Sequence, residues 1–258
     1  MTAAVSTEWL KLRRSRPPWI SLLAATIGTA VGGLFTYISL HPERARDLGL
    51  LGDKAQLASL EPGWAGYFGL LAQIVAVGGV LIFGLTMLWT FGREFADRTA
   101  KDLLALPTGR AAIVTAKMAT AAVWSLLLTG YIVVLGLGIG AGLGLAGWSA
   151  RIAIDGVVRI AVTAVLTIAL TSTFGLAASL GRGYLAGVAA LFAALFSAQV
   201  IAALGYGGWY PYAVPALYAG ITGRADGPHV AGYIAVAAVA VASLAGTIGW
   251  WQHADHHQ

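Results

Sequence analysis

The chain has 258 residues, of which 58% are hydrophobic and 10% are charged, whereas about 25% of the residues in a soluble domain are charged. So few charges could not cover a water-exposed surface, and the composition indicates an integral membrane protein. Sixteen Lys and Arg against eleven Asp and Glu give a net charge of +5. These basic residues lie between apolar runs, so nucleic acid is not an expected partner. The absence of Cys excludes disulfides and thiol catalysis.

The N-terminal segment, residues 1–18, predicts an amphipathic helix that lies in the plane of the membrane surface. Thr7 can cap this helix, and Glu8 then falls in its first turn, where the helix dipole favours an acid. Lys11 and Arg14 can reach lipid phosphates. The alternative is a basic tail that only sets the topology. One face of the helix would carry the apolar residues Val5, Trp9 and Leu12.

Charged residues divide the rest of the chain into apolar runs, and a helix needs roughly 20 residues to cross about 30 Å of hydrocarbon. A cleaved signal peptide has an apolar stretch of about 7 to 15 residues, and the first apolar run of this chain is longer. A signal peptide is therefore the minor alternative to a first membrane span. Six runs are long enough to span the membrane, at about 19–40, 63–92, 111–143, 157–180, 184–204 and 229–251.

Residues 205–222 are rich in Gly, Pro, Tyr and Trp, and lipid cannot satisfy an open backbone. We therefore expect an interfacial or re-entrant segment there, with a seventh span as the alternative. The fold class is then all-α and membrane-embedded, a single domain over residues 1–258. With the N-terminus inside, ten Lys and Arg residues fall in cytoplasmic segments and six outside. This bias predicts the cell membrane with both termini in the cytoplasm.

The loop after the second span, residues 93–110, holds closely spaced charges of both signs. Glu94 with Arg98, and Asp97 with Lys101, are i,i+4 pairs with the acid first, an order that supports a helix. We expect a short charged helix that ends at Pro107. Its apolar edge could pack on the membrane domain or dock on a soluble partner, and it consists of Leu103, Leu104 and Leu106.

This loop carries a resemblance to a known family. The chain resembles the permease subunits of ABC-2 type exporters in its six spans, in its basic N-terminal helix and in a pattern of about 25 residues between spans two and three. The family more often has a Gly before the Thr, where this chain has Arg98. The pattern consists of Glu94, Thr99, Leu103-Leu104, Pro107, Arg110 and Lys117.

The resemblance implies a coupling helix that sits in a cleft of a separate ATP-binding subunit. The resemblance also implies two further partners of the chain: a second permease subunit, identical or homologous, and the membrane lipid. The alternative is a loop that only sets topology. No Gly-Lys pair of a P-loop occurs in the sequence, so ATP and Mg are expected on the partner and no cofactor on this chain. The residues implied in the coupling contact are Glu94, Arg98, Thr99, Lys101, Asp102, Leu103 and Leu104.

Polar residues inside the spans are few, and we predict that some of them face a substrate pathway: Gln73, Thr86, Thr163, Thr167 and Thr171. Hydrogen bonding between helices is the plainer interpretation. Arg151, Asp155 and Arg159 are spaced for an ion-pair ladder, or else form an outer gate. Glycines that repeat every four residues, such as Gly136 with Gly140 and Gly138 with Gly142, allow helices to approach closely within or between subunits.

No Asp, Glu or Lys lies in the middle of a predicted span, which argues against transport driven by protons or sodium. No hydrolase motif occurs, and the histidines near the C-terminus lack a metal-binding pattern, so we predict neither catalytic nor metal-binding residues. The first hypothesis is a permease of an ATP-driven exporter, which moves an amphipathic drug, peptide antibiotic or lipid outward. The alternatives are a membrane anchor or assembly module for a cytoplasmic partner, and a membrane-embedded enzyme.

Overall fold

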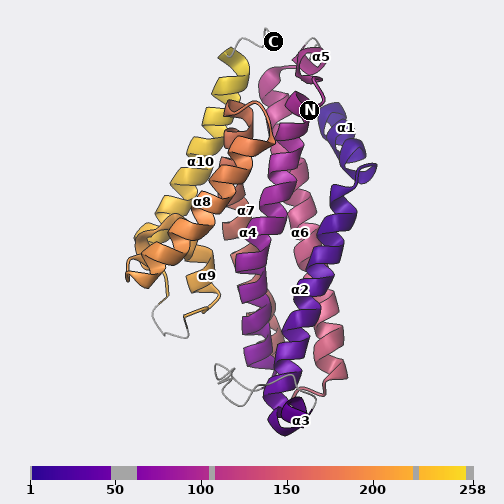
Figure 1. The fold of residues 1–258 in the computed structure, drawn as a ribbon, viewed down its shortest axis with the longest axis vertical. Coiled ribbons are helices and arrows are strands. Elements are labelled where there is room, and N and C mark those ends of the chain that lie inside the picture. Colours follow the sequence, from indigo (N-terminus) through magenta and orange to yellow (C-terminus); the bar gives the residue numbers. More distant parts are fainter. Residues whose placement is uncertain (1, 48–62, 105–107, 223–226, 254–258) are drawn as a thin grey trace.

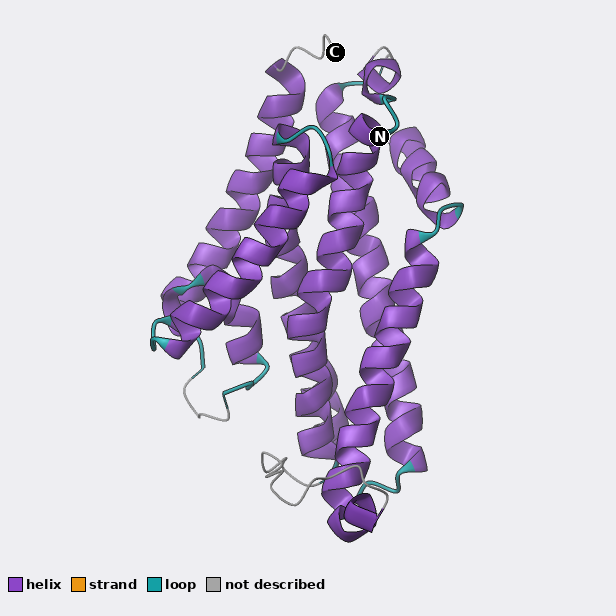
Figure 2. Ribbon diagram, viewed as in Figure 1, coloured by secondary structure: helices purple, strands orange, loops and turns teal. Residues whose placement is uncertain are grey.

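The computed structural model describes residues 2–47, 63–104, 108–222 and 227–253. These residues form a bundle of helices and loops without β-strands (Figures 1 and 2), so the predicted all-α membrane fold is confirmed. Six helices of this described part are long and apolar enough to span a membrane: α2 (Pro17–Leu40), α4 (Trp64–Ala96), α6 (Arg110–Gly142), α7 (Ala150–Leu180), α8 (Tyr184–Ala203) and α10 (Val230–His253). The shorter elements are α1 (Thr2–Arg13), α3 (Pro42–Asp47), α5 (Ala100–Leu104), η1 (Gly207–Trp209), η2 (Pro211–Ala213) and α9 (Val214–Tyr218).

Helices α4 and α6 are longer than a bilayer requires. Each has 33 residues, which gives a length of about 50 Å against a hydrocarbon thickness of about 30 Å. Both helices therefore continue past the hydrocarbon region. Figure 1 shows α5 and both chain ends at one end of the bundle and α3 at the other. We refer to the first of these as the terminal end.

The segment between α8 and α10 folds back against the bundle. Figure 1 shows that α8 and α10 stop well short of the end that carries α3, and that α9 lies beside α4. The short helix α9 contacts both α4 and α7, and Ala213, Val214 and Ala219 are at most 3% exposed. Its five residues are too few to cross a membrane. We keep the name re-entrant segment for residues 205–222, and the depth at which this segment lies in the membrane stays a prediction.

The centre of the bundle is the contact between α4 and α7, the most extensive one in the structure. Aromatic rings of each helix lie against glycines of the other. A Cβ atom at Gly84 would lie 2.9 Å from the Phe174 ring, and one at Gly175 would lie 2.9 Å from the Phe91 ring. Because the glycines have no side chain, the two backbones can approach closely and gain dispersion energy that lipid cannot replace.

The repeated glycines of α6 fall on two different faces. A Cβ atom at Gly140 would lie 2.6 Å from Cη2 of Trp64, and one at Gly136 would lie 2.6 Å from Cδ1 of Leu71. A Cβ atom at Gly138 or Gly142 would have no neighbour within 4 Å. One glycine pair of α6 therefore packs against α4 of the same chain, and the other pair faces away from it.

Gly140→Leu should destabilise the fold by about 1–3 kcal/mol, because the new side chain would overlap the buried Trp64. Gly138→Leu is the matched control, because it adds the same atoms to the open face of the same helix. Thermal unfolding midpoints of the purified chain in detergent would measure both effects. Equal losses of stability in the two variants would contradict this packing.

Candidate functional site

Four charged side chains meet at the terminal end of the bundle, where α1, α4 and α6 come together. We call Glu8, Lys11, Glu94 and Lys117 the charge cluster. Lys117 is fully buried, and the side chains of Glu94 and Glu8 are only 2% and 6% exposed. Taking charges out of water costs several kcal/mol per ion unless they are paired and hydrogen-bonded. The charge cluster is therefore stable only if each of its charged groups is paired and hydrogen-bonded.

Every N–H of the Lys117 ammonium has an acceptor. Its Nζ donates to Glu94 Oε1 at 2.7 Å, to Glu8 Oε2 at 3.0 Å and to the carbonyl oxygen of Thr90 at 3.2 Å. Lys11 Nζ donates to Glu8 Oε1 at 3.0 Å and to Glu94 Oε1 at 3.1 Å. Two carboxylates and two ammonium groups cancel, so the buried cluster is neutral and joins three helices.

Lys11 is the member of the cluster that water reaches, with a side chain 26% exposed. Burial lowers its pKa, but the carboxylates of Glu8 and Glu94 outweigh this effect, and the pKa of Lys11 lies above its ordinary value. Because folding raises the pKa of Lys11, its pairing with the two carboxylates stabilises the fold fully at any pH below the ordinary lysine pKa. This stabilisation is lost only as the pH rises through the raised pKa of Lys11.

The N-terminal helix differs from its prediction. It begins at Thr2 rather than near Thr7, so Glu8 lies mid-helix and its carboxylate pairs with Lys117 instead of the helix dipole. Lys11, predicted to reach lipid phosphates, points into the charge cluster. The predicted apolar face does pack inward, since Leu12 is 1% exposed and Trp9 meets Trp124 edge-on at 6.3 Å.

A tight turn joins α4 to α5 and closes on Glu94. The Thr99 backbone N–H donates to the Glu94 carbonyl oxygen at 2.9 Å, and Thr99 Oγ1 donates to Glu94 Oε2 at 2.6 Å. Arg98 has a φ of 59°, the left-handed conformation that ends many helices and favours glycine. The predicted i,i+4 pair of Glu94 with Arg98 is therefore wrong, because the helix ends before Arg98 and Glu94 takes other partners.

The residues implied in coupling divide into exposed and buried ones. Glu94 is buried, so it can hold the turn but cannot touch a partner. Leu103 is partly buried against the hydrophobic cluster of Met87 and Phe91. Pro107 and the side chains of Lys101 and Leu104 lie outside the described residues. Docking on a partner stays a prediction, and the exposed residues that could take part are Arg98, Thr99 and Asp102.

The other members of the family pattern also join elements at the terminal end. Arg110 Nη1 donates to the carbonyl oxygens of Trp251 and Gln252 at 3.1 and 3.0 Å, which satisfies the C-terminal carbonyls of α10 and complements its dipole. Together with Glu94, Thr99 and Lys117, Arg110 ties the ends of α1, α4, α6 and α10 into one assembly.

The predicted pathway residues do not line one common cavity. The hydroxyl groups of Thr163, Thr167 and Thr171 are buried and donate to carbonyl oxygens of α7 itself at 2.7–2.8 Å. Thr86 likewise donates to its own helix, at 2.9 Å. Gln73 Nε2 donates to the Gly220 carbonyl oxygen at 3.3 Å, so it holds the re-entrant segment. A direct role of these residues in transport stays a prediction.

The charges at the start of α7 form only part of the predicted ladder. Arg151 and Asp155 lie 3.9 Å apart and are 92% and 73% exposed, so this ion pair contributes little. Arg159 Nε instead donates to the Tyr218 carbonyl oxygen at 3.4 Å. With Gln73, Arg159 fixes the re-entrant segment to the bundle.

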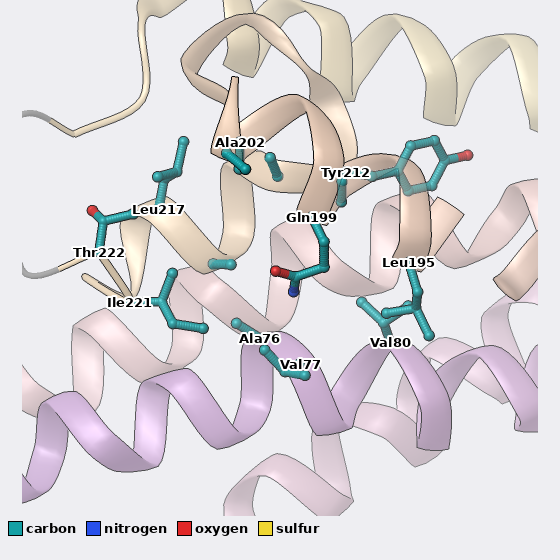
Figure 3. A pocket seen from close by; sticks show the side chains of 14 residues that line it. Ala76, Val77, Val80, Leu195, Gln199, Ala202, Tyr212, Leu217, Ile221 and Thr222 are labelled. Atoms are coloured by element: carbon teal, nitrogen blue, oxygen red, sulfur yellow. The ribbon is translucent and has the colours of Figure 1, made fainter. Parts of the chain in front are cut away.

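A cavity of about 430 Å³ lies between the middle of α4, the C-terminal half of α8 and the segment from η2 to just beyond α9 (Figure 3). Its walls are mainly apolar, with Val80 and Leu195 on facing helices, and Figure 3 shows the Gln199 amide extending from α8 toward α4. The volume and the sparse polar groups suit a small organic ligand. Gln73 is among the predicted pathway residues and Gln199 is not, although Gln199 borders this cavity and a lone amide in an apolar span is a usable signal.

The model of the family described as ABC-2 family transporter protein matches residues 4–198, a range that includes the charge cluster, the turn and α5. The chain belongs to the ABC-2 transporter family. It is therefore a multi-pass membrane subunit of a transport system. The family implies association with an ATP-binding subunit.

Among curated proteins, this ABC-2 permease is similar to a bacitracin transport permease protein of Bacillus licheniformis. The two are 28% identical over 186 residues, which cover 71% of this chain and 88% of the relative. No solved structure matches the chain.

Lys117→Met should destabilise the permease by about 3–5 kcal/mol, because it leaves two buried carboxylates with too few partners. Lys11→Met, which removes the partly exposed ammonium, should cost clearly less. Adding Glu94→Gln to Lys117→Met should restore part of the loss, because one unpaired charge disappears. Thermal unfolding midpoints of the purified chain in detergent check all three, and wild-type stability of Lys117→Met would contradict a structural role for the cluster.

Proposed function

We propose that this chain is the membrane-spanning permease of an ATP-driven exporter and that a separate subunit hydrolyses the ATP. The observation that carries the proposal is the turn into α5, which exposes Arg98, Thr99 and Asp102 while its base is fixed to three helices by buried Glu94. A force applied to α5 would pass through Glu94 and Lys117 into α4, α6 and α1. A permease without its own P-loop needs such a mechanical connection between the ATP-hydrolysing subunit and its membrane helices.

The terminal end then faces the cytoplasm, where the ATP-binding subunit is found. The Lys and Arg bias of the loops supports this orientation. A substrate would cross between two copies of this chain, or between this chain and a homologous permease, because six helices alone do not build a twofold pathway.

The cavity between α4 and α8 supports an amphipathic substrate. Its apolar walls would take a hydrophobic group, while Gln199, Tyr212 and Thr222 offer polar atoms around it. Among the residues that the structure describes, no Asp, Glu, Lys or Arg lines it, which is consistent with a substrate that brings its own apolar surface. The relative's name assigns it to bacitracin transport, so bacitracin is the first substrate to test.

The test uses the tagged full-length chain, isolated in mild detergent with any P-loop protein that accompanies it. We expect co-isolation of an ATPase subunit whose ATP hydrolysis rises when bacitracin is added. Exchanging the charges in Lys101→Glu with Asp102→Lys should abolish the stimulation while the thermal unfolding midpoint of the permease stays unchanged, because Asp102 is exposed.

The matched control is Arg151→Glu with Asp155→Lys, the same exchange at exposed positions near the start of α7. It should leave stimulation at the wild-type level. Equal stimulation in wild type and both double variants would contradict docking through α5. A stably bound partner without nucleotide turnover would instead support the membrane-anchor hypothesis.

A further inference from the structure

A second hollow of about 310 Å³ lies near the terminal end, between the start of α2, the second half of α4 and the start of α8. Its lining is apolar and includes Ile20 and Ala24 of α2 with Leu85 and Leu88 of α4. Along α2 it extends from Pro17 to Ala24, a distance of about 10 Å at the rise of an α-helix. We call it the α2–α4 groove.

The hydroxyl groups of Ser21 and Thr86 in its walls already have hydrogen-bond partners within the protein. Ser21 Oγ donates to the Pro18 carbonyl oxygen at 2.9 Å and accepts from Trp124 Nε1 at 3.0 Å. Thr86 Oγ1 donates to the Ile82 carbonyl oxygen at 2.9 Å. The groove thus suits hydrocarbon better than a polar solute, which would lose its water without gaining new partners.

Basic residues stand where the groove reaches the terminal end. Arg16 directly precedes Pro17 and is exposed. Arg93 follows Trp89 by one turn, and its guanidinium lies 4.7 Å from the centre of the Trp89 ring. Arg93 Nε is buried without a hydrogen-bond partner among the described residues. Two acids lie on this stretch of α4 and its cap: buried Glu94, which is paired with Lys117 and Lys11, and the exposed Asp97. Arg16 and Arg93 therefore outnumber the one exposed acid, and the rim is basic.

We propose that the α2–α4 groove binds one acyl chain of an anionic phospholipid, with the lipid phosphate held by Arg16 and Arg93. The apolar floor matches the chain, and the basic rim matches the phosphate at the depth where headgroups lie. This inference rests on the proposed function only in assigning the lipid to the cytoplasmic leaflet. The bound lipid would brace the start of α2 against α4, directly beside the helix that carries Glu8 and Lys11.

The rim charges favour a lipid over a second copy of the chain. A twofold interface through this groove would bring the same patch of each copy together, and the Arg16 and Arg93 of both copies would then gather in one interface. Like charges in contact oppose such an interface, whereas an anionic headgroup neutralises them.

The test is photolabelling of the purified full chain in phosphatidylcholine vesicles that contain a minor share of phosphatidylglycerol with a diazirine on its acyl chain. Mass spectrometry should find the adducts concentrated on groove residues such as Ile20 and Leu85. Arg16→Gln with Arg93→Gln should lower labelling by phosphatidylglycerol roughly tenfold and leave labelling by the matching phosphatidylcholine probe unchanged.

Leu85→Trp should block labelling by both probes, because it fills the rim of the groove at a half-exposed position that tolerates a larger side chain. Leu127→Trp is the matched control on the exposed face of α6 and should label like wild type. Adducts spread evenly over lipid-facing helices, or full labelling of Leu85→Trp, would overturn the proposal. The proposal would also be overturned if bacitracin removed the adducts from the groove, or if a second copy of the chain were found to cover the groove. ATP hydrolysis is not measured, so the result is independent of the proposed export.

Discussion

The structure depends on the neutrality of one buried group of charges. Lys117 lies two turns inside α6 without access to water, and it can stay charged there only because Glu8 and Glu94 converge on it from two other helices. Each of these partners belongs to a different helix. The charges can pair only if α1, α4 and α6 lie in these positions relative to one another. The energetic cost of an unpaired charge thereby fixes the geometry of the whole terminal end.

This constraint explains how a helix of five residues is held in a fixed position, as the proposed contact with an ATP-binding subunit requires. An isolated α5 would not be stable in water, but the turn before it is closed by the Thr99 hydroxyl on the same Glu94 that binds Lys117. The family more often has glycine at the position of Arg98, and the φ of 59° found there shows why glycine suits it. At the far side of α4, Gln73 and Arg159 anchor the re-entrant segment that borders the cavity. A single long helix thus connects the turn before α5 with the cavity wall.

Hydropathy predicted the six long helices because a membrane requires apolar runs of a fixed minimum length, and the charges that end them are visible in the sequence. The contacts of these charges were not predictable in the same way. The i,i+4 rule assigned Glu94 to Arg98, but a left-handed residue ended the helix first, and Lys117 counted as a loop charge although α6 extends beyond the bilayer and buries it. Glycine spacing indicated close packing, yet only the three-dimensional arrangement distinguishes the face of Gly140 from that of Gly138.

The most direct measurement is the distance distribution between spin labels on α1 and α5, attached at Arg13→Cys and Asp102→Cys, two exposed positions in a chain without native Cys. If the charge cluster holds these elements together, the distribution is narrow with Lys117 present and becomes broad in the Lys117→Met background. A distribution that stays equally narrow without the Lys117 ammonium would contradict the central role of this buried charge.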